Sequence, residues 1–390
     1  MPYATLKMIE ENDLYRSSVL NLQASENRLS PDVKRALSSD LASRYSHLMK
    51  NSINSYGGTS IFEEIYAKTI KDTAELFGSR YAEIRPVGGH IAVLAALMTV
   101  SRKGQKAAAI GEKYGGYPGY SSKYIGRLLD LNFIEIPFND DSQEIEYDAF
   151  EKMVSLEKPD LVILGQSAFV KSYDLKRINE ICEPHDIRII YDGSHVMGLI
   201  AGGEFQPDVL KYSSLLVGST HKSFFGPQGG IILTNSPDIM TKMEDNLTWM
   251  TMDNMHPNRI AALGIAVEEM KEHGKDYAKQ LHLNSRNLGE ELFGAGIPAR
   301  FKPWYSETHQ VLLDLKKEED RISFSRKLEK NGIIVDRDGR IGTSEVTRMG
   351  CTDMTKVADL ISRANKGQNV LNEVRDLVKS FKLKYWRESL

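Results

Sequence analysis

The stretch Ser219-Thr220-His221-Lys222-Ser223-Phe224-Phe225-Gly226-Pro227-Gln228-Gly229-Gly230 directly follows the apolar run 215–218, which is typical of a buried strand. It places Lys222 just beyond the end of a predicted strand, among small, hydroxyl-bearing and glycine residues. Earlier in the chain, the apolar run 187–191 ends at Asp192, and Gly193-Ser194-His195 follows. Ligands of α/β proteins bind at the carboxyl ends of strands, so Lys222 and Asp192 are expected to share one site there.

A lysine and a carboxylate at two strand ends suit pyridoxal phosphate (PLP). An amine forms a Schiff base only when it is neutral, so a Schiff-base lysine needs a pKa lowered by burial or by a nearby cation. The PLP ring accepts electrons while its nitrogen stays protonated, and a fixed carboxylate keeps that proton in place. Either residue alone is typical of a surface or a turn. Together with His195 and the glycine-rich tail, Lys222 and Asp192 predict a PLP site.

The composition is that of an ordinary soluble globular protein. The chain has 390 residues, 41% hydrophobic and 26% charged, with a formal net charge of -3. This length predicts two domains, and the lack of long charged runs argues against nucleic acid or a membrane surface as the main partner. No apolar run approaches about 20 residues, and residues 1–5 do not resemble a secretory signal. Cys182 and Cys351 lie far apart without a CxxC motif, so we expect reduced thiols, a cytoplasmic location and no clustered metal site.

Short apolar runs alternate with helical patterns through much of the chain. Strand-like runs lie at 81–85, 107–110, 133–137, 161–164, 188–191, 215–218 and 230–234, and two more at 310–315 and 332–335. The alternation predicts an α/β fold with a mostly parallel sheet between helices. We predict an N-terminal arm with helices at 1–50, a large PLP-binding domain at 51–274 and a small C-terminal α/β domain at 275–390.

A candidate phosphate site follows the first of these strands. The segment 85–90 contains Gly88 and Gly89 and leads into an alanine-rich helix. Two glycines at a helix start let backbone N–H groups approach an anion, and the helix dipole adds to that attraction. Such a pair is often only a turn, but together with Lys222 it predicts the site of the PLP phosphate.

Several motifs then occur in a characteristic order. They are Ala24-Ser25-Glu26-Asn27 with Ser30-Pro31, Tyr56-Gly57-Gly58, Arg85-Pro86-Val87-Gly88-Gly89, Asp192 to His195 with Gly198 to Gly203, Thr220-His221-Lys222 with Gly226 to Gly230, and Gly342 to Arg348. Through them the chain, over residues 15–350, resembles the serine hydroxymethyltransferase family of fold type I PLP-dependent enzymes. The resemblance implies an aspartate aminotransferase-like fold with a seven-stranded sheet. It also implies conversion of serine to glycine, with transfer of a one-carbon unit to a reduced pterin (tetrahydrofolate or tetrahydromethanopterin).

The resemblance implies roles for individual residues around the cofactor. Lys222 would carry the Schiff base, and Asp192 would pair with the pyridine nitrogen. His195 and Ser167 would approach the phenolic oxygen of the cofactor. The other implied cofactor-binding residues are Gly88, Gly89, Ser219 and His221 near the phosphate, Tyr117 and Tyr45.

The resemblance also implies a substrate site and a partner. Ser25 and Arg348 would bind the substrate carboxylate, although many members have their arginine one position later, where this chain has Met349. Tyr45 and Tyr56 match tyrosines that cross into the active site of a neighbouring subunit. A homodimer with shared active sites is therefore implied.

Two segments depart from the family pattern. Members typically carry Tyr-Ala-Glu-Gly where this chain has residues 45–48, so His47 replaces a glutamate that handles a proton or contacts the pterin. Histidine can act as an acid or a base near neutral pH, and we predict His47 as a catalytic residue. In the segment 114–120, Tyr117 replaces a histidine that stacks on the cofactor ring, which a tyrosine can also do. Glu112 stands where an apolar residue is common, which alters the expected pterin pocket.

These departures leave alternative functions open. The chain could be a threonine-type aldolase that works without a pterin. It could also be a PLP-dependent aminotransferase or decarboxylase on the same fold, although the motifs 24–27 and 220–222 argue against that. A non-catalytic relative would keep the scaffold alone, and the presence of Lys222, Asp192 and His195 argues against it.

Overall fold

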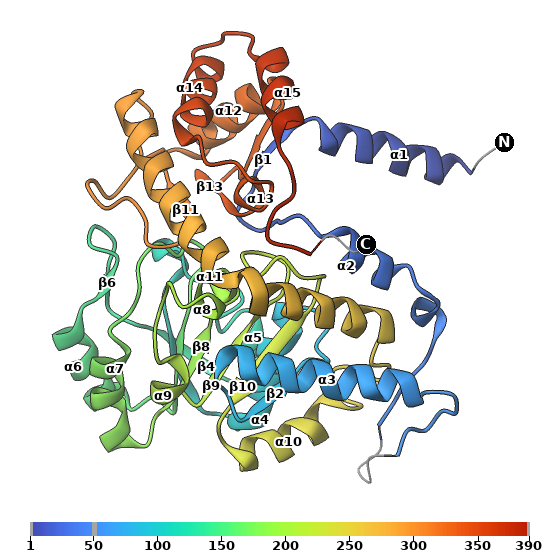
Figure 1. Ribbon diagram of the computed structural model, residues 1–390. Helices are drawn as coiled ribbons and strands as arrows, with labels where there is room; N and C mark the ends of the chain where they lie inside the picture. The colour runs from blue at the N-terminus through green and yellow to red at the C-terminus, as the bar shows by residue number, and fades with distance from the viewer. Residues whose placement is uncertain (1–2, 49–52, 388–390) are drawn as a thin grey trace. The chain divides into compact units, whose positions relative to one another are not determined.

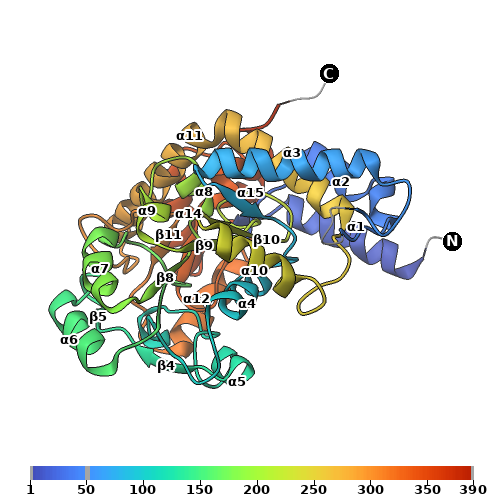
Figure 2. The same ribbon diagram turned by 90° about the horizontal axis from the view of Figure 1, so that it is seen from below.

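The computed structural model describes residues 3–48 and 53–387, which form two compact units (Figures 1 and 2). The sheet unit comprises Leu29–Ala278 and Tyr385–Leu390, and the terminal unit comprises Met1–Arg28 and Lys279–Lys384. The division at Lys279 lies within the long helix α11 (Pro257–Gly294), close to the expected boundary after residue 274. The expected boundary between residues 50 and 51 lies outside the described residues, and the three-part division stays a prediction.

The sheet unit alternates strands and helices along the chain. Its strands are β2 (Tyr81–Glu83), β3 (Lys106–Ala109), β4 (Asn132–Glu135), β5 (Phe138–Asn139), β6 (Glu144–Ile145), β7 (Leu161–Leu164), β8 (Arg188–Asp192), β9 (Leu215–Ser219) and β10 (Gly230–Thr234). Its helices are α2 (Pro31–Leu37), α3 (Ser60–Phe77), α4 (Gly89–Val100), α5 (Ile125–Leu129), α6 (Tyr147–Glu157), α7 (Leu175–Cys182), α8 (Met197–Ala201), α9 (Val209–Tyr212), α10 (Pro237–Leu247) and the first part of α11.

Seven strands form one mostly parallel sheet. Their order is β2-β10-β9-β8-β7-β3-β4. The strands from β9 to β4 run parallel to one another, whereas β10 is antiparallel to both β9 and β2. The predicted α/β class is confirmed, and each of the seven strands overlaps a run predicted from the sequence. Because neighbouring strands are parallel, their carboxyl ends meet at one edge of the sheet.

Helices cover both faces of this sheet. Every residue of β7 and β9 is buried, as their continuous apolar sequences predict. On one face the alanine-rich helix α4 packs against β9 and β10, with α10 beside it. The alanines of α4 belong to the same buried cluster as alternate residues of the strands, and their small side chains let the helix lie close to the sheet.

Helix α3 and the first part of α11 lie side by side (Figures 1 and 2). A β-carbon on Gly264 of α11 would lie 2.6 Å from the hydroxyl oxygen of Thr69 on α3. Glycine at this position therefore permits the close approach of the two helices. The Thr69 hydroxyl instead donates a hydrogen bond of 2.7 Å to the Ile65 carbonyl.

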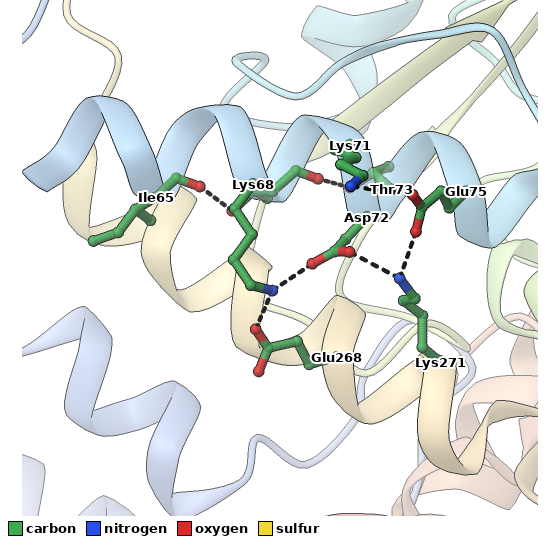
Figure 3. A network of polar contacts seen from close by, with 9 residues as sticks. Ile65, Lys68, Lys71, Asp72, Thr73, Glu75, Glu268 and Lys271 are labelled. Atoms are coloured by element: carbon green, nitrogen blue, oxygen red, sulfur yellow. Dashed lines mark hydrogen bonds and ion pairs between the residues drawn. The ribbon is translucent and has the colours of Figure 1, made fainter.

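Charged side chains connect the same two helices on their exposed side (Figure 3). Lys68 of α3 lies 2.6 Å from Glu268 of α11 and 2.5 Å from Asp72, and Lys271 of α11 lies 2.8 Å from both Asp72 and Glu75. The Asp72 side chain is 14% exposed and contacts both lysines. Burial by itself raises the pKa of Asp72, but hydrogen bonds from Lys271 and Lys68 outweigh burial and lower that pKa.

The terminal unit combines segments from both ends of the chain. Strand β1 (Leu20–Leu22) pairs in parallel with β12 (Ile333–Val335), and β11 (Gln310–Leu312) pairs antiparallel with β13 (Arg340–Gly342). Its other helices are α1 (Ala4–Ser17), α12 (Glu318–Glu329), α13 (Ser344–Arg348), α14 (Met354–Asn365) and α15 (Leu371–Ser380). One buried apolar cluster includes residues of β1, β12 and α14 and gives this unit a core of its own. Across both units, none of the helices described is long and apolar enough to cross a bilayer.

We expect the substitution Asp72→Asn to lower the free energy of unfolding by about 1 kcal/mol at pH 7 and low salt, because networked ion pairs stabilise more than isolated ones. The pKa of Asp72 is lowered in the folded state, so its contribution is present above the unfolded pKa of about 3.9 and is lost as the pH falls through the folded value. Urea unfolding at several pH values measures the difference. Asp141→Asn, at an exposed turn, is the matched control. If the loss of unfolding free energy caused by Asp72→Asn stays the same in about 1 M salt, the prediction is contradicted.

Candidate active site

The carboxyl ends of the central strands surround a cavity in the sheet unit. Asp192 ends β8, Lys222 follows β9, Ser167 follows β7, and Tyr117 lies in the segment after β3. The cavity is lined by Gly89, His90, Val93, Tyr117, Gln166, Ser167, Asp192, Ser194, His195, Ser219 and Lys222. Seven residues that the sequence assigns to the cofactor site thus lie around one space, although they come from distant parts of the chain.

Lys222 lies beside an imidazole. Its Nζ atom is 3.3 Å from Nε2 of His195. The next residue, Ser223, donates a 2.6 Å hydrogen bond to the His195 carbonyl and accepts one of 3.1 Å from the Gly198 amide. The lysine loop is therefore fixed to the start of α8. Two basic nitrogens at this distance disfavour a state in which both are charged, so the pair can exchange a proton with a ligand.

Asp192 presents an oriented carboxylate to the cavity. It is 8% exposed, and its Oδ2 accepts a 2.7 Å hydrogen bond from the Tyr120 hydroxyl. Its Oδ1 accepts a 2.9 Å hydrogen bond from the Ser194 amide. Burial raises the pKa of Tyr120 well above its usual value, and the charge of Asp192 and the hydrogen bond to it act in the same direction. Tyr120 therefore stays a proton donor that holds the carboxylate in place.

The amino end of α4 also lines the cavity, through Gly89 and His90. The first turn of α4 starts after Gly88 without a side-chain cap, which leaves its backbone N–H groups available. A β-carbon on Gly89 would collide with the Ser219 hydroxyl oxygen and would lie 3.3 Å from that of Ser194, so both hydroxyls lie at this turn. Backbone N–H groups and hydroxyls together are suited to a phosphate.

His221 adds a further polar atom near this site. Its Nδ1 is buried and has no hydrogen-bond partner within residues 3–48 and 53–387. Burial and then the charge of Lys222 lower the pKa of His221 to about 4, so the ring is neutral at neutral pH. A buried imidazole nitrogen without a partner in the protein fits a site that a polar ligand completes.

A backbone contact joins the lysine loop to the phosphate site. The Gly230 amide donates a 2.9 Å hydrogen bond to the Pro86 carbonyl. A β-carbon on Gly230 would lie 2.6 Å from the Gly88 carbonyl oxygen. Glycine is therefore needed for the end of the lysine loop to reach the segment that precedes α4.

Tyr117 and Ser167 complete the walls. The Tyr117 hydroxyl lies 3.0 Å from Nδ1 of His90, and the Tyr117 ring packs edge-on against Tyr120 at 5.3 Å between centroids. The Ser167 amide donates a 2.7 Å hydrogen bond to the Gly115 carbonyl, which positions the segment after β7 against the segment after β3. The cavity therefore offers a carboxylate, a lysine and an anion site, which match the ring nitrogen, the aldehyde and the phosphate of PLP.

Three predicted residues lie at another place in the sheet unit. Tyr45, His47 and Tyr56 are not among the residues that line the cavity. The rings of Tyr45 and Tyr56 lie 4.8 Å apart, and both side chains are exposed. His47 is buried, with its ring 4.6 Å from that of Trp249 and its Nδ1 3.3 Å from a carboxylate oxygen of Asp253.

The two predicted carboxylate-binding residues belong to the terminal unit. Arg348 ends α13 and is fully buried, and Ser25 follows β1 and is half-buried. A β-carbon on Gly342 would collide with the backbone of Ala24, so the segment that carries Ser25 packs directly on the end of β13. The terminal unit thus places Ser25 and Arg348 on segments that pack against each other.

The sequence analysis did not single out five residues that shape this site. They are His90, Val93, Gln166 and Ser194, which line the cavity, and Tyr120, which holds Asp192. Ser194 lies inside the quoted motif 192–195, His90 ends the segment 85–90, and Gln166 directly precedes the predicted Ser167, so their neighbours were a signal. Tyr120 lies in the segment 114–120 that the sequence singled out, but its pairing with Asp192 joins residues 72 positions apart and could not be read from that segment.

Comparisons with known proteins identify the family. The family described as serine hydroxymethyltransferase matches residues 4–361 of the chain. The chain belongs to the serine hydroxymethyltransferase family. It is 34% identical to a serine hydroxymethyltransferase of Methanobrevibacter smithii, over 96% of this chain and 93% of that protein. It is 33% identical to one of Methanothermobacter thermautotrophicus, with the same coverage of both chains.

A solved structure supports the fold of this serine hydroxymethyltransferase family member. The crystal structure of an L-threonine transaldolase from Pseudomonas fluorescens matches with a TM-score of 0.91, covering 98% of this chain and 92% of that chain. The two sequences are 23% identical, so the likeness establishes the fold alone.

We expect the substitution Tyr120→Phe to lower the free energy of unfolding of the PLP-free protein by roughly 2 kcal/mol, since a hydrogen bond to a buried charged group is lost. The affinity for PLP should fall as well, because Asp192 loses one of the two groups that orient it. Chemical unfolding and titration with PLP followed by fluorescence measure the two effects. Tyr124→Phe, at an exposed position on the same segment, is the control. Unchanged stability and PLP affinity would show that the Tyr120 hydroxyl does not support Asp192.

Proposed function

We propose that this chain is a PLP-dependent enzyme that makes or breaks the Cα–Cβ bond of β-hydroxy amino acids. Its main reaction would convert serine to glycine and pass a one-carbon unit to a reduced pterin, either tetrahydrofolate or tetrahydromethanopterin. The observation that carries the proposal is the position of Lys222, Asp192 and His195 around one cavity beside the amino end of α4. Membership of the serine hydroxymethyltransferase family supports the choice of substrates.

The residues of the cavity have complementary tasks in this proposal. Bound PLP supplies an aldehyde that reacts with amines and a protonated ring that takes up the electron pair released when a bond to Cα breaks. Asp192 holds the proton on the ring nitrogen, and Lys222 provides the amine. Gly88, Gly89, Ser219 and His221 bind the phosphate.

Proton transfer during bond cleavage needs a base near the substrate. Removal of the β-hydroxyl proton of serine starts the cleavage, and a proton must then reach Cα. His195 is suited to such transfers because its Nε2 lies 3.3 Å from the Lys222 amine. Ser25 and Arg348 would bind the substrate carboxylate, for which a guanidinium group provides two parallel donors.

The proposal includes a homodimer in the cytoplasm. Tyr45 and Tyr56 form an exposed aromatic pair, as expected for residues that reach a neighbouring subunit. Burial raises the pKa of the Cys182 thiol to about 12 and that of Cys351 to about 11. Both cysteines are therefore unreactive thiols, which is compatible with a reducing compartment.

A second candidate is a threonine-type aldolase that needs no pterin. The observation that favours it is His47, which stands where the family typically has a glutamate, together with Glu112 and Tyr117 near the expected pterin pocket. Both candidates use the same PLP site, so the dependence on a pterin separates them.

We expect Lys222→Ala to abolish covalent attachment of PLP while the protein stays folded, because no other cavity lysine replaces its amine. The PLP-loaded protein is reduced with borohydride, and its peptides are analysed by mass spectrometry. The mass of reduced PLP should appear on Lys222 of the protein without substitutions and should be absent from the Lys222→Ala protein. Lys211→Ala, on α9, is the control and should retain the modification. Attachment at another lysine would exclude Lys222 from this role.

We expect the PLP-loaded enzyme to release glycine from serine faster when tetrahydrofolate or tetrahydromethanopterin is added. Amino-acid products are measured by chromatography after incubation with serine, allo-threonine and threonine. Cleavage that is indifferent to either pterin would support the aldolase instead. Formation of keto acids or loss of carbon dioxide would indicate an aminotransferase or a decarboxylase. A protein that neither binds PLP nor cleaves these substrates would be non-catalytic.

A further inference from the structure

His47 lies in a segment whose backbone is held on both sides. The Met255 amide donates a 3.0 Å hydrogen bond to the Ser46 carbonyl, and the Ser55 amide donates one of 2.9 Å to the His47 carbonyl. The His47 amide in turn donates to the Asn54 side chain at 3.3 Å. These contacts fix the position from which the His47 side chain leaves the backbone.

The ring of His47 is oriented by two side chains from the segment between α10 and α11. Nδ1 lies 3.3 Å from Oδ1 of Asp253, and the ring packs edge-on against Trp249 at 4.6 Å between centroids. The other carboxylate oxygen of Asp253, Oδ2, accepts a hydrogen bond from the Tyr45 hydroxyl. The Asp253 carboxylate thus contacts both Tyr45 and His47.

The contact between Tyr45 and Asp253 helps to identify which ring nitrogen of His47 carries the proton. A carboxylate oxygen accepts hydrogen bonds and has no proton of its own to donate. The hydrogen bond to Asp253, followed by partial burial and the charge of Asp253, raises the pKa of Tyr45 to about 12, so Tyr45 remains the donor. His47 must then donate from Nδ1, which leaves the lone pair on Nε2 to take up a proton.

We infer that Asp253 is the positioning residue of His47 and that the two side chains form a histidine–carboxylate pair for proton transfer at Nε2. The inference rests on the proposed function, which makes His47 an acid–base group. The pair carries a net charge of -1 when His47 is neutral and of 0 after Nε2 has taken up a proton, while the Nδ1 proton stays with the ring. These are the same two charge states as those of one glutamate, the residue that His47 replaces.

The charge balance explains how a histidine can occupy this position. A neutral imidazole without a carboxylate would change from 0 to +1 on taking up a proton, so the site would be one unit more positive than a glutamate site in both states. Asp253 comes from a segment about 200 residues away and supplies the missing negative charge. The sequence motif around His47 does not contain this carboxylate.

The first test measures the ring proton directly and does not depend on catalysis. The full-length protein is labelled with 15N-histidine, and the signal of His47 is identified by its loss in His47→Gln among the nine histidines. Long-range proton–nitrogen spectra should show the proton on Nδ1. In the Asp253→Asn protein the tautomer of His47 with its proton on Nε2 should become more populated. In the Asp141→Asn protein the tautomer populations of His47 should stay unchanged. A proton on Nε2 in the unmodified protein would overturn the inference.

The second test uses serine cleavage by the PLP-loaded enzyme. Asp253→Asn should lower kcat by roughly tenfold to a hundredfold, within the range of positioned acid–base catalysis, with KM for serine changed by less than about twofold. Asp253→Glu should restore part of kcat. In a His47→Glu background the substitution Asp253→Asn should cause no loss, because the glutamate needs no partner and the two carboxylates no longer repel each other.

The outcomes separate the inference from the proposed function. An equal loss of kcat from Asp253→Asn in both backgrounds would show that Asp253 supports the fold and not His47, which would overturn the inference. If the enzyme cleaves no β-hydroxy amino acid, the proposed function fails, and the nitrogen spectra still decide whether Asp253 orients His47.

Discussion

The hydrogen bond from the Gly230 amide to the Pro86 carbonyl connects the loop that carries Lys222 to the segment that precedes α4. Gly230 starts β10, which runs antiparallel between β2 and β9, so its amino end meets the carboxyl ends of both neighbours. The lysine loop leaves from β9, and the phosphate segment leaves from β2. A β-carbon on Gly230 would strike the Gly88 carbonyl, so this close approach requires glycine at position 230.

The polar groups of the cavity are stabilised by hydrogen bonds from neighbouring protein groups. Buried carboxylates are costly unless hydrogen bonds compensate them. Asp192 receives such bonds from the Tyr120 hydroxyl and from the Ser194 amide, which compensate its burial. The Ser223 hydroxyl bridges the lysine loop and α8 in a similar way. These hydrogen bonds fix the positions of Asp192 and of the loop that carries Lys222.

Much of this architecture could be predicted from residues close together in the chain. Continuous apolar runs, such as those of β7 and β9, identify the strands of a sheet that is covered on both faces. Asp192 and Lys222 each follow such a run, so their place at one sheet edge follows from the parallel order. The three-residue strand β1 has no such pattern, and its pairing with β12 joins segments more than 300 residues apart. The roles of Tyr120 and Asp253 likewise depend on contacts across the fold.

The sequence by itself determined the α/β class and the family, and it predicted Lys222, Asp192 and His195 as the centre of a PLP site; the structure places all three around one cavity. These conclusions rest on local patterns, because burial, strand ends and glycine-rich turns are written in neighbouring residues. Only the tertiary structure decided which side chains orient those residues. Tyr120 reaches Asp192, and Asp253 reaches His47, because folding brings together segments that the sequence separates. A hydrogen bond forms only when the donor–acceptor distance lies within a few tenths of an ångström of about 2.9 Å, and no pattern along the chain specifies such a distance.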